Sequence, residues 1–266
     1  MKKQVFFQEK KISYEISGDG PVLLLLHGFL ESKMIWNEFA EELQTDFTVI
    51  SIDLPGHGET EMIAGIHSMK LMSEVVKTVL FSEGVMKAVV IGHSMGGYVA
   101  LQFAVDNEEM ILGLVLFHSH ASADSDEARE NRQRTINIVR QNHGGFIMQF
   151  IPDLFDPQHV SEYSREIEKL QKQASLLAPE AIIAALSGMR DRPNQLQYLS
   201  LSPNPVLFII GKQDSRIPYS QVIAQAAIPS HAEMLLLGDV GHMGFIEAPV
   251  KTLQALKHFS IRCFEV

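Results

Sequence analysis

The sequence is poor in the residues that mark several common classes of protein. Its only cysteine is Cys263, which excludes a disulfide framework and a cysteine-based metal site. Basic residues are outnumbered, with 22 lysines and arginines against 32 acidic residues and a formal net charge of −10. Nucleic acids and anionic membranes bind basic surfaces, so this charge argues against both partners. The 266 residues, 46% of them hydrophobic, suffice for one large domain or for a domain with a sizeable insertion.

Long hydrophobic runs are missing as well. The longest apolar stretch, PVLLLLHGF at residues 21–29, is far too short to span a bilayer. Residues 1–16 carry positive charge, but polar residues return after only three consecutive apolar ones, unlike in a signal peptide. We therefore expect a cytoplasmic protein that acts on a small-molecule substrate, with no nucleic-acid or membrane partner. The oligomeric state stays open.

Apolar runs and helical patterns alternate along most of the chain. Two short alternating segments over residues 4–17 predict a β-hairpin. Apolar runs that predict buried strands follow at residues 22–26, 47–53, 86–91, 110–118, 205–211 and 232–238. Helical patterns separate most of these runs, which predicts an α/β fold with a mostly parallel central sheet and helices on both faces. Such sheets bind ligands at the carboxyl ends of their strands.

This alternation stops at His118. Residues 120–200 contain helical segments and no convincing strand, with Gly144 and Gly145 expected to separate two of the helices. An all-helical block inside an α/β domain indicates a cap inserted after one strand. We expect a core formed by residues 1–119 and 203–266, and a helical cap formed by residues 120–202.

A serine stands between glycines in the motif GHSMG at residues 92–96, after an apolar run and before a helical pattern. The glycines permit a turn so sharp that Ser94 is held exposed in a strained conformation. Its backbone lies at a helix N-terminus, where free N–H groups favour negative charge. An ordinary glycine-rich turn is the alternative interpretation, but the flanking strand and helix favour a nucleophile.

A serine hydroxyl becomes a useful nucleophile only with a base that takes its proton and an acid that orients the base. Asp214 follows the apolar run at 205–211, and His242 stands between two glycines after the run at 232–238. In isolation Asp214 could be a turn residue and His242 an ordinary loop histidine, and Asp239 is a second candidate for the acid. Together with Ser94 they predict a catalytic triad.

Attack on a carbonyl produces an oxyanion, which requires preorganised N–H donors. The backbone N–H of Met95, directly after the serine, is one candidate. The other is the backbone N–H of Phe29 in the HGF segment, where Gly28 allows close approach. We interpret His27 as a residue that stabilises this loop.

Five segments together resemble the α/β-hydrolase superfamily over essentially the whole chain: HGF (27–29), DLPGHG (53–58), GHSMGG (92–97), GKQDSRIP (211–218) and GHM (241–243). The chain is most similar to the capped subgroup of small esterases, lactonases and C–C bond hydrolases. The resemblance implies hydrolysis of a carboxylic ester, thioester or lactone without a cofactor or metal. It also implies that Asp53 and His57 hold a loop. C–C bond cleavage or a lyase or synthase step by the same triad is an alternative, and a non-catalytic ligand-binding protein is another.

The lining of the substrate pocket is less clear from the sequence. The loop after residues 110–118 and the apolar segment of the cap suggest five candidates: His118, His120, Phe146, Phe150 and Met243. The histidines could equally be surface residues, and the phenylalanines could simply attach the cap to the core. Arg190 or Arg192 could bind a substrate carboxylate or form surface salt bridges. No histidine spacing typical of a metal site on a helix occurs in the sequence.

Overall fold

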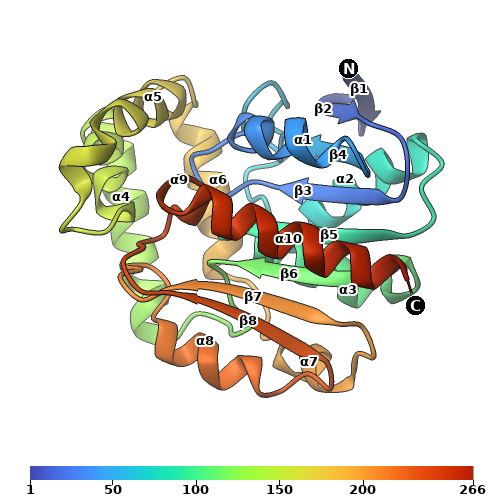
Figure 1. Ribbon diagram of the computed structural model, residues 1–266. Helices are drawn as coiled ribbons and strands as arrows, with labels where there is room; N and C mark the ends of the chain where they lie inside the picture. Colours follow the sequence, from blue (N-terminus) through green and yellow to red (C-terminus); the bar gives the residue numbers. More distant parts are fainter. Residues whose placement is uncertain (266) are drawn as a thin grey trace.

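A computed structural model describes residues 1–265 and places one eight-stranded sheet at the centre of the protein (Figure 1). The spatial order of the strands is β1-β2-β4-β3-β5-β6-β7-β8. Their bounds are β1 (Lys2–Phe7), β2 (Lys10–Ser17), β3 (Val22–Leu26), β4 (Thr48–Ile52), β5 (Ala88–His93), β6 (Ile111–Phe117), β7 (Val206–Gly211) and β8 (Ala232–Leu237). The pairs β1–β2 and β2–β4 are antiparallel and all other neighbours are parallel, as the alternation of strands and helices predicts.

The predicted N-terminal hairpin is formed by β1 and β2, which pair from Lys2 opposite Glu15 to Phe7 opposite Lys10. Its two-residue turn, Gln8 and Glu9, has φ of +49° and +63°. Positive φ at both central residues is the geometry that matches the twist of a hairpin. The turn adopts it without the glycine or asparagine that usually marks it in a sequence.

The inner strands are buried on both faces, which explains their unbroken apolar sequences. Leu23, Leu24, Leu25 and Leu26 of β3 have no exposed surface, and every residue of β5 is buried. Full burial of such a side chain stabilises the fold by about 1.5–3 kcal/mol. The sheet therefore gives a rigid base from which the loops at its carboxyl edge project.

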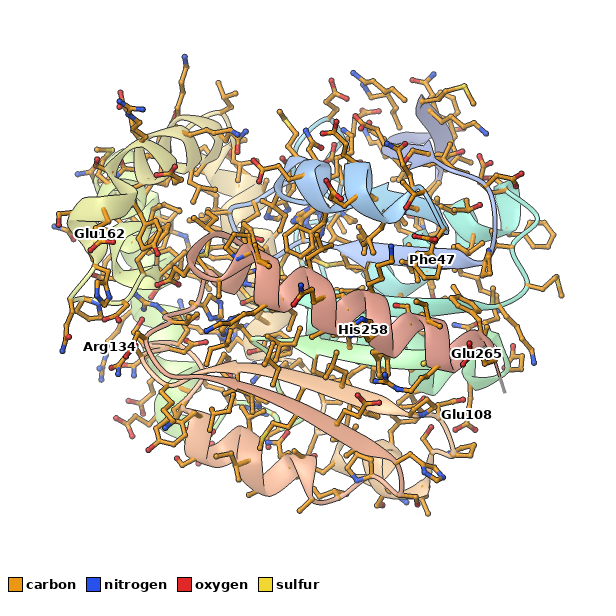
Figure 2. All side chains as sticks on the ribbon, in the orientation of Figure 1. Phe47, Glu108, Arg134, Glu162, His258 and Glu265 are labelled. Atoms are coloured by element: carbon orange, nitrogen blue, oxygen red, sulfur yellow. The ribbon has the colours of Figure 1, made fainter. Side chains whose placement is uncertain are left out.

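Helices cover both faces of the sheet. In Figure 1, α1 and α10 lie in front of it, and α2 and α3 lie behind it; the packed side chains fill the layers between them (Figure 2). The helices are α1 (Asn37–Leu43), α2 (Met69–Ser82), α3 (Met95–Asp106), α4 (Asp126–Phe150), α5 (Ser164–Ala174), α6 (Pro179–Arg190), α7 (Leu196–Leu201), α8 (Tyr219–Ala226), α9 (Gly244–Glu247) and α10 (Pro249–Phe264). Short 3-10 turns are η1 (Lys33–Trp36), η2 (Glu108–Met110), η3 (Pro152–Leu154) and η4 (Val160–Tyr163). None of the helices within residues 1–265 is long and apolar enough to cross a membrane.

The segment between β6 and β7 carries α4 to α7, and α4 and α5 project beyond the carboxyl ends of the strands (Figure 1). Arg134 on α4 and Glu162 on η4 lie on its outer surface (Figure 2). The expected break at Gly144 and Gly145 lies instead at Asn142, which has non-helical φ and ψ of −156° and 77°. The Asn142 side chain accepts a hydrogen bond from the Gly145 N–H at 2.9 Å, as an N-cap does, so the chain re-enters the helix directly after the kink.

Candidate active site

Ser94 occupies the sharp turn between β5 and α3. Its φ and ψ are +50° and −114°, outside the regions that side chains normally allow, and it is the only half-buried residue between 88 and 104, where all others are buried. The neighbouring glycines are required sterically. A Cβ on Gly92 would lie 2.3 Å from the carbonyl oxygen of Gly96, and one on Gly96 would lie 2.3 Å from that of Leu26. The turn therefore fixes the serine at the surface of the sheet edge, as the motif predicts.

His242 and Asp214 meet at the same edge. The Nδ1 of His242 lies 2.8 Å from Oδ2 of Asp214, and both side chains are almost completely buried. The other carboxylate oxygen, Oδ1, accepts hydrogen bonds from the N–H groups of Arg216 at 2.8 Å and Ile217 at 2.9 Å. Burial alone would raise the pKa of Asp214, but the attraction to its two imidazole neighbours and the hydrogen bonds with them hold it well below its usual value. Because the ionised carboxylate can only accept, Nδ1 of His242 carries the proton and Nε2 is left free as a base.

A second histidine contacts the same carboxylate. Nδ1 of His118 lies 3.0 Å from Oδ2 of Asp214, and its Nε2 is buried without a hydrogen-bond partner within residues 1–265. Burial lowers the pKa of His118 to about 4, so the ring is neutral at pH 7 and donates its Nδ1–H. His118 also has a φ of +48°, a conformation uncommon for a residue other than glycine. It therefore acts on Asp214 rather than on a ligand in the cavity.

The two backbone N–H groups expected as oxyanion donors belong to Met95, directly after the serine, and to Phe29, which lines the same cavity as Ser94. Met95 is the first residue of α3, and Phe29 follows β3 in the neighbouring loop. Within residues 1–265 neither N–H donates to another protein group. Gly28, beside Phe29, is tightly packed, since a Cβ there would lie 2.7 Å from both Glu31 Oε2 and His93 Nδ1. The two donors are thus unoccupied and sit on rigid backbone.

Glu31 and His93 connect the loops that carry these groups. The Glu31 carboxylate accepts from the Gly28 N–H at 2.5 Å and from His93 Nδ1 at 3.0 Å, and His93 Nε2 donates to the carbonyl of His242 at 2.9 Å. Burial opposes a charge on His93, yet the Glu31 carboxylate raises its pKa above the usual value. Both ring nitrogens of His93 face acceptors, which requires the doubly protonated ring. A buried ion pair therefore joins the Phe29 loop, the serine turn and the His242 loop.

Glu247 holds the His242 loop from the other side. Its carboxylate accepts hydrogen bonds from the N–H groups of Gly241, Met243 and Asp156, at 2.8–3.1 Å. Burial raises the pKa of Glu247 above its usual value. Since Asp156 belongs to the segment between β6 and β7, this one side chain fixes His242 relative to both the core and that segment.

Two of the three residues expected to support loops, His27 and Asp53, contact neighbouring loops, and Nδ1 of His57 lies 3.0 Å from the carbonyl oxygen of Pro55 in its own loop. His27 accepts a hydrogen bond from the Leu54 N–H at 2.9 Å through Nε2, and its pKa is well below the usual value because the ring is buried. Asp53 pairs with the buried Lys33 at 2.6 Å. These contacts tie the HGF and DLPGHG segments together beneath the site.

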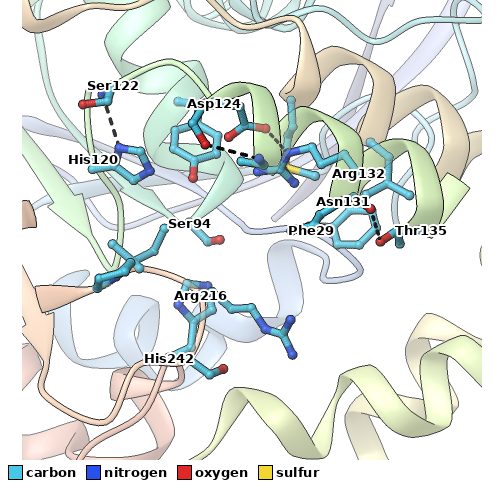
Figure 3. Close-up of a pocket in the computed structure, with 18 of the residues that line it drawn as sticks. Phe29, Ser94, His120, Ser122, Asp124, Asn131, Arg132, Thr135, Arg216 and His242 are labelled. Atoms are coloured by element: carbon cyan, nitrogen blue, oxygen red, sulfur yellow. Dashed lines mark hydrogen bonds and ion pairs between the residues drawn. The ribbon is translucent and has the colours of Figure 1, made fainter.

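Ser94 and His242 open onto one cavity of about 590 Å³, with both side chains on the same side of it (Figure 3). This volume is within the range of small-molecule sites. The walls combine aromatic, aliphatic, polar and charged residues: Phe29, Glu31, Tyr98, His120, Ser122, Ala123, Asp124, Ser125, Ala128, Asn131, Arg132, Thr135, Phe150, Leu154, Leu186, Met189, Ser215, Arg216, Ile217, Pro218 and Gln221. Most of the wall opposite the sheet therefore comes from the segment between β6 and β7.

The five expected pocket residues divide into two groups. His120 and Phe150 line the cavity. His118, Phe146 and Met243 do not: His118 is turned to Asp214, Phe146 packs against Phe29 with ring centres 6.5 Å apart, and Met243 is completely buried. The difference arises because these three side chains stabilise the layers behind the wall.

The two expected arginines are engaged elsewhere. Arg190 pairs with Asp191 at 2.8 Å on the outside of α6. Arg192 is buried, forms an ion pair with Asp124 and stacks 4.0 Å above the ring of Tyr98. Neither lines the cavity, whereas Arg132 and Arg216 do.

Three side chains have the composition of a metal site. Ligand atoms of His118, Asp214 and His242 lie within 4.8 Å of one another. Their two N–O separations of 2.8 and 3.0 Å are hydrogen-bond lengths, and metal binding would require both Nδ1 atoms to lose their protons. We interpret the cluster as two imidazoles that donate to one carboxylate.

Several residues of the site carry no signal of their role in the sequence. Glu31 and Glu247 lie close in sequence to Phe29 and His242, but nothing in the pattern indicates which N–H groups they accept from. His93 occupies a variable position of the GHSMG motif, where the serine motif sets no requirement. For Glu31 and Glu247, the only signal in the sequence is that an acidic residue lies near a predicted loop of the site.

Comparisons with known proteins match most of the chain. The model of the family described as "alpha/beta hydrolase fold" matches residues 21–249. A thermophilic esterase from Thermogutta terrifontis, solved with malate bound, is 31% identical, with 99% of each chain covered and a TM-score of 0.92. The 2-succinyl-6-hydroxy-2,4-cyclohexadiene-1-carboxylate synthase of Citrobacter koseri is 24% identical over 89% of this chain and 92% of that protein.

One curated relative is longer than this chain. The dihydrolipoyllysine-residue acetyltransferase component of the acetoin cleaving system of Cupriavidus necator is 26% identical over 89% of this chain. The match spans 63% of that relative's length, less than two thirds.

Proposed function

Since this chain belongs to the alpha/beta hydrolase fold family, we propose that it is a serine hydrolase that cleaves a carboxylic ester, thioester or lactone of a small substrate. The observation that carries the proposal is the strained Ser94 at the cavity, beside a His242 whose Nδ1 is fixed on Asp214. The esterase from Thermogutta terrifontis, similar over its full length, supports ester chemistry.

In the proposed reaction, Nε2 of His242 takes the proton of the Ser94 hydroxyl as its oxygen attacks the substrate carbonyl. The negative charge that develops on the carbonyl oxygen is stabilised by the N–H groups of Phe29 and Met95. His242 then gives the proton to the leaving alcohol or thiol, and an acyl-enzyme remains on Ser94. A water molecule, activated by the same ring, releases the acid.

Asp214 serves this cycle without changing its charge. Its low pKa keeps it ionised, so it holds the required tautomer of His242 and stabilises the imidazolium formed in each half-reaction. Glu31 and Glu247 keep the donor loop and the histidine loop in place while charge moves between them.

The direct test is the rate of hydrolysis of short p-nitrophenyl esters by Ser94→Ala. We expect a decrease in kcat of about a thousandfold or more, because the nucleophile is removed while the N–H donors remain. Ser200→Ala, an exposed serine outside the cavity, is the matched control and should keep the parent rate. Equal rates for Ser94→Ala and the parent would refute the proposal.

A second candidate function is a lyase or synthase step, or C–C bond cleavage, by the same three side chains. The similarity to the synthase of Citrobacter koseri favours keeping it. Ester and C–C substrates assayed in parallel separate the two, because both depend on Ser94 but only one class is turned over. A non-catalytic ligand-binding protein would turn over neither.

A further inference from the structure

Two guanidinium groups face the cavity that contains Ser94 and His242. Arg132 comes from α4, and Arg216 comes from the loop after β7, two residues beyond Asp214. In Figure 3 the side chain of Arg216 starts near the His242 ring and extends away from it into the open part of the cavity. A positive group thus lies within the same space as the nucleophile.

The charge of Arg132 is only partly neutralised. Its Nε forms an ion pair with Asp124, but Asp124 also pairs with Arg192, so two guanidinium groups share one carboxylate. The guanidinium of Arg192 has further hydrogen-bond partners, since it also donates to the carbonyls of Ser122 at 3.2 Å and Met189 at 2.9 Å. Beyond Asp124, Arg132 contacts only the sulfur of Met189, at 3.7 Å, within residues 1–265. One positive charge is therefore left over on this wall.

Arg216 is oriented but weakly paired. Its guanidinium lies 4.5 Å from the centre of the Phe150 ring, which fixes the plane of the group. The only carboxylate within ion-pair distance of the guanidinium in residues 1–265 is Asp153, at 3.5 Å, and the Asp153 side chain is 68% exposed. An ion pair this long and this exposed contributes little, so most of the donors of Arg216 remain available.

The carboxylates of Glu31 and Asp214 do not neutralise the positive charges of these two arginines. Glu31 lines the cavity, but its carboxylate is committed to the Gly28 N–H and to His93. Asp214 lies behind His242 and is not part of the wall. The cavity walls therefore offer an ion-pairing site for a negatively charged group close to the reacting atoms.

We propose that Arg216, with Arg132 as the second cation, binds a free carboxylate of the substrate. The inference rests on the proposed function and specifies its substrate class: esters, thioesters or lactones whose acyl part also bears a carboxylate. A planar guanidinium fork matches a carboxylate with two parallel hydrogen bonds, and the stack on Phe150 pre-organises that fork. Anchoring the far end of the acyl chain would place its carbonyl at Ser94.

The test measures binding separately from turnover. In the Ser94→Ala background, calorimetry compares monoethyl adipate, which carries a carboxylate, with ethyl hexanoate, which has a similar length and no charge. We expect the charged ester to bind at least tenfold tighter, and the added Arg216→Gln substitution to reduce this preference by about tenfold or more. Arg190→Gln, which removes an arginine outside the cavity, is the matched control and should leave the preference as it was.

Arg216→Lys provides a second variant that keeps the charge but not the fork, and it should retain part of the preference. Thermal unfolding of each variant checks that the fold is kept. An absent preference, or one that Arg216→Gln and Arg190→Gln change equally, would overturn the assignment. Because binding is read in a protein without the nucleophile, failure here is distinct from failure of ester hydrolysis in the parent protein.

Discussion

Removal of the Glu247 carboxylate tests whether the histidine loop is held as the structure indicates. Glu247→Ala leaves the N–H groups of Gly241, Met243 and Asp156 without their acceptor. Met243 and Asp156 are 0% and 2% exposed, so water reaches those donors poorly. An unsatisfied buried donor costs about 1–3 kcal/mol, and the three together should lower the free energy of unfolding by about 3–9 kcal/mol.

The assay is urea unfolding followed by the fluorescence of Trp36, the only tryptophan, which is fully buried. Glu247→Gln retains one oxygen acceptor and should lose less, about 1–3 kcal/mol. Glu109→Ala, at an exposed position, is the control and should change the stability by less than about 0.5 kcal/mol. The reasoning would be refuted if Glu247→Ala cost less than about 1 kcal/mol or left kcat/KM at the parent value.

Two further predictions concern the histidines. His118→Leu removes one hydrogen-bond donor from Asp214, so kcat/KM should fall by about tenfold and the acidic limb of its pH profile should move to higher pH. His118→Asn keeps a donor near the position of Nδ1 and should restore both the rate and the profile. An identical pH profile in all three proteins would exclude a positioning role for His118. Burial lowers the pKa of His67, His118 and His120 to about 4. Between pH 6.5 and 4 only the unfolded chain binds protons at these sites, so the free energy of unfolding should fall on acidification by about 3 kcal/mol for each. His93, whose pKa is raised, binds its proton in both states over this range and does not offset the loss. Urea titrations across this range check the sign, and a rise in stability on acidification would contradict it.

The sequence is informative where a single local pattern decides the structure. Unbroken apolar runs exist because β3 and β5 are covered on both faces, and these strands lie within two residues of their predicted positions. The GHSMG motif could be interpreted because its glycines are required by steric crowding within the turn itself. The predicted Ser94, Asp214 and His242 follow the sheet-edge rule, which brings loops after parallel strands together.

Prediction is weaker where a side chain acts across the fold. His118 was expected in the pocket and contacts Asp214 instead, and its φ of +48° is a conformation that the sequence does not signal. The spacing of arginines along the sequence does not show which of them line the cavity. The sequence offers Arg190 and Arg192 as candidates, and nothing in it shows that they form ion pairs with Asp191 and Asp124.

Covalent trapping of the nucleophile tests the central claim most directly. A fluorophosphonate incubated with the parent protein, followed by mass spectrometry of the digested chain, should find one adduct, on the peptide that contains Ser94. The same experiment on Ser94→Ala should find none. A label on another residue, or equal labelling of the two proteins, would contradict the assignment of Ser94 as the nucleophile.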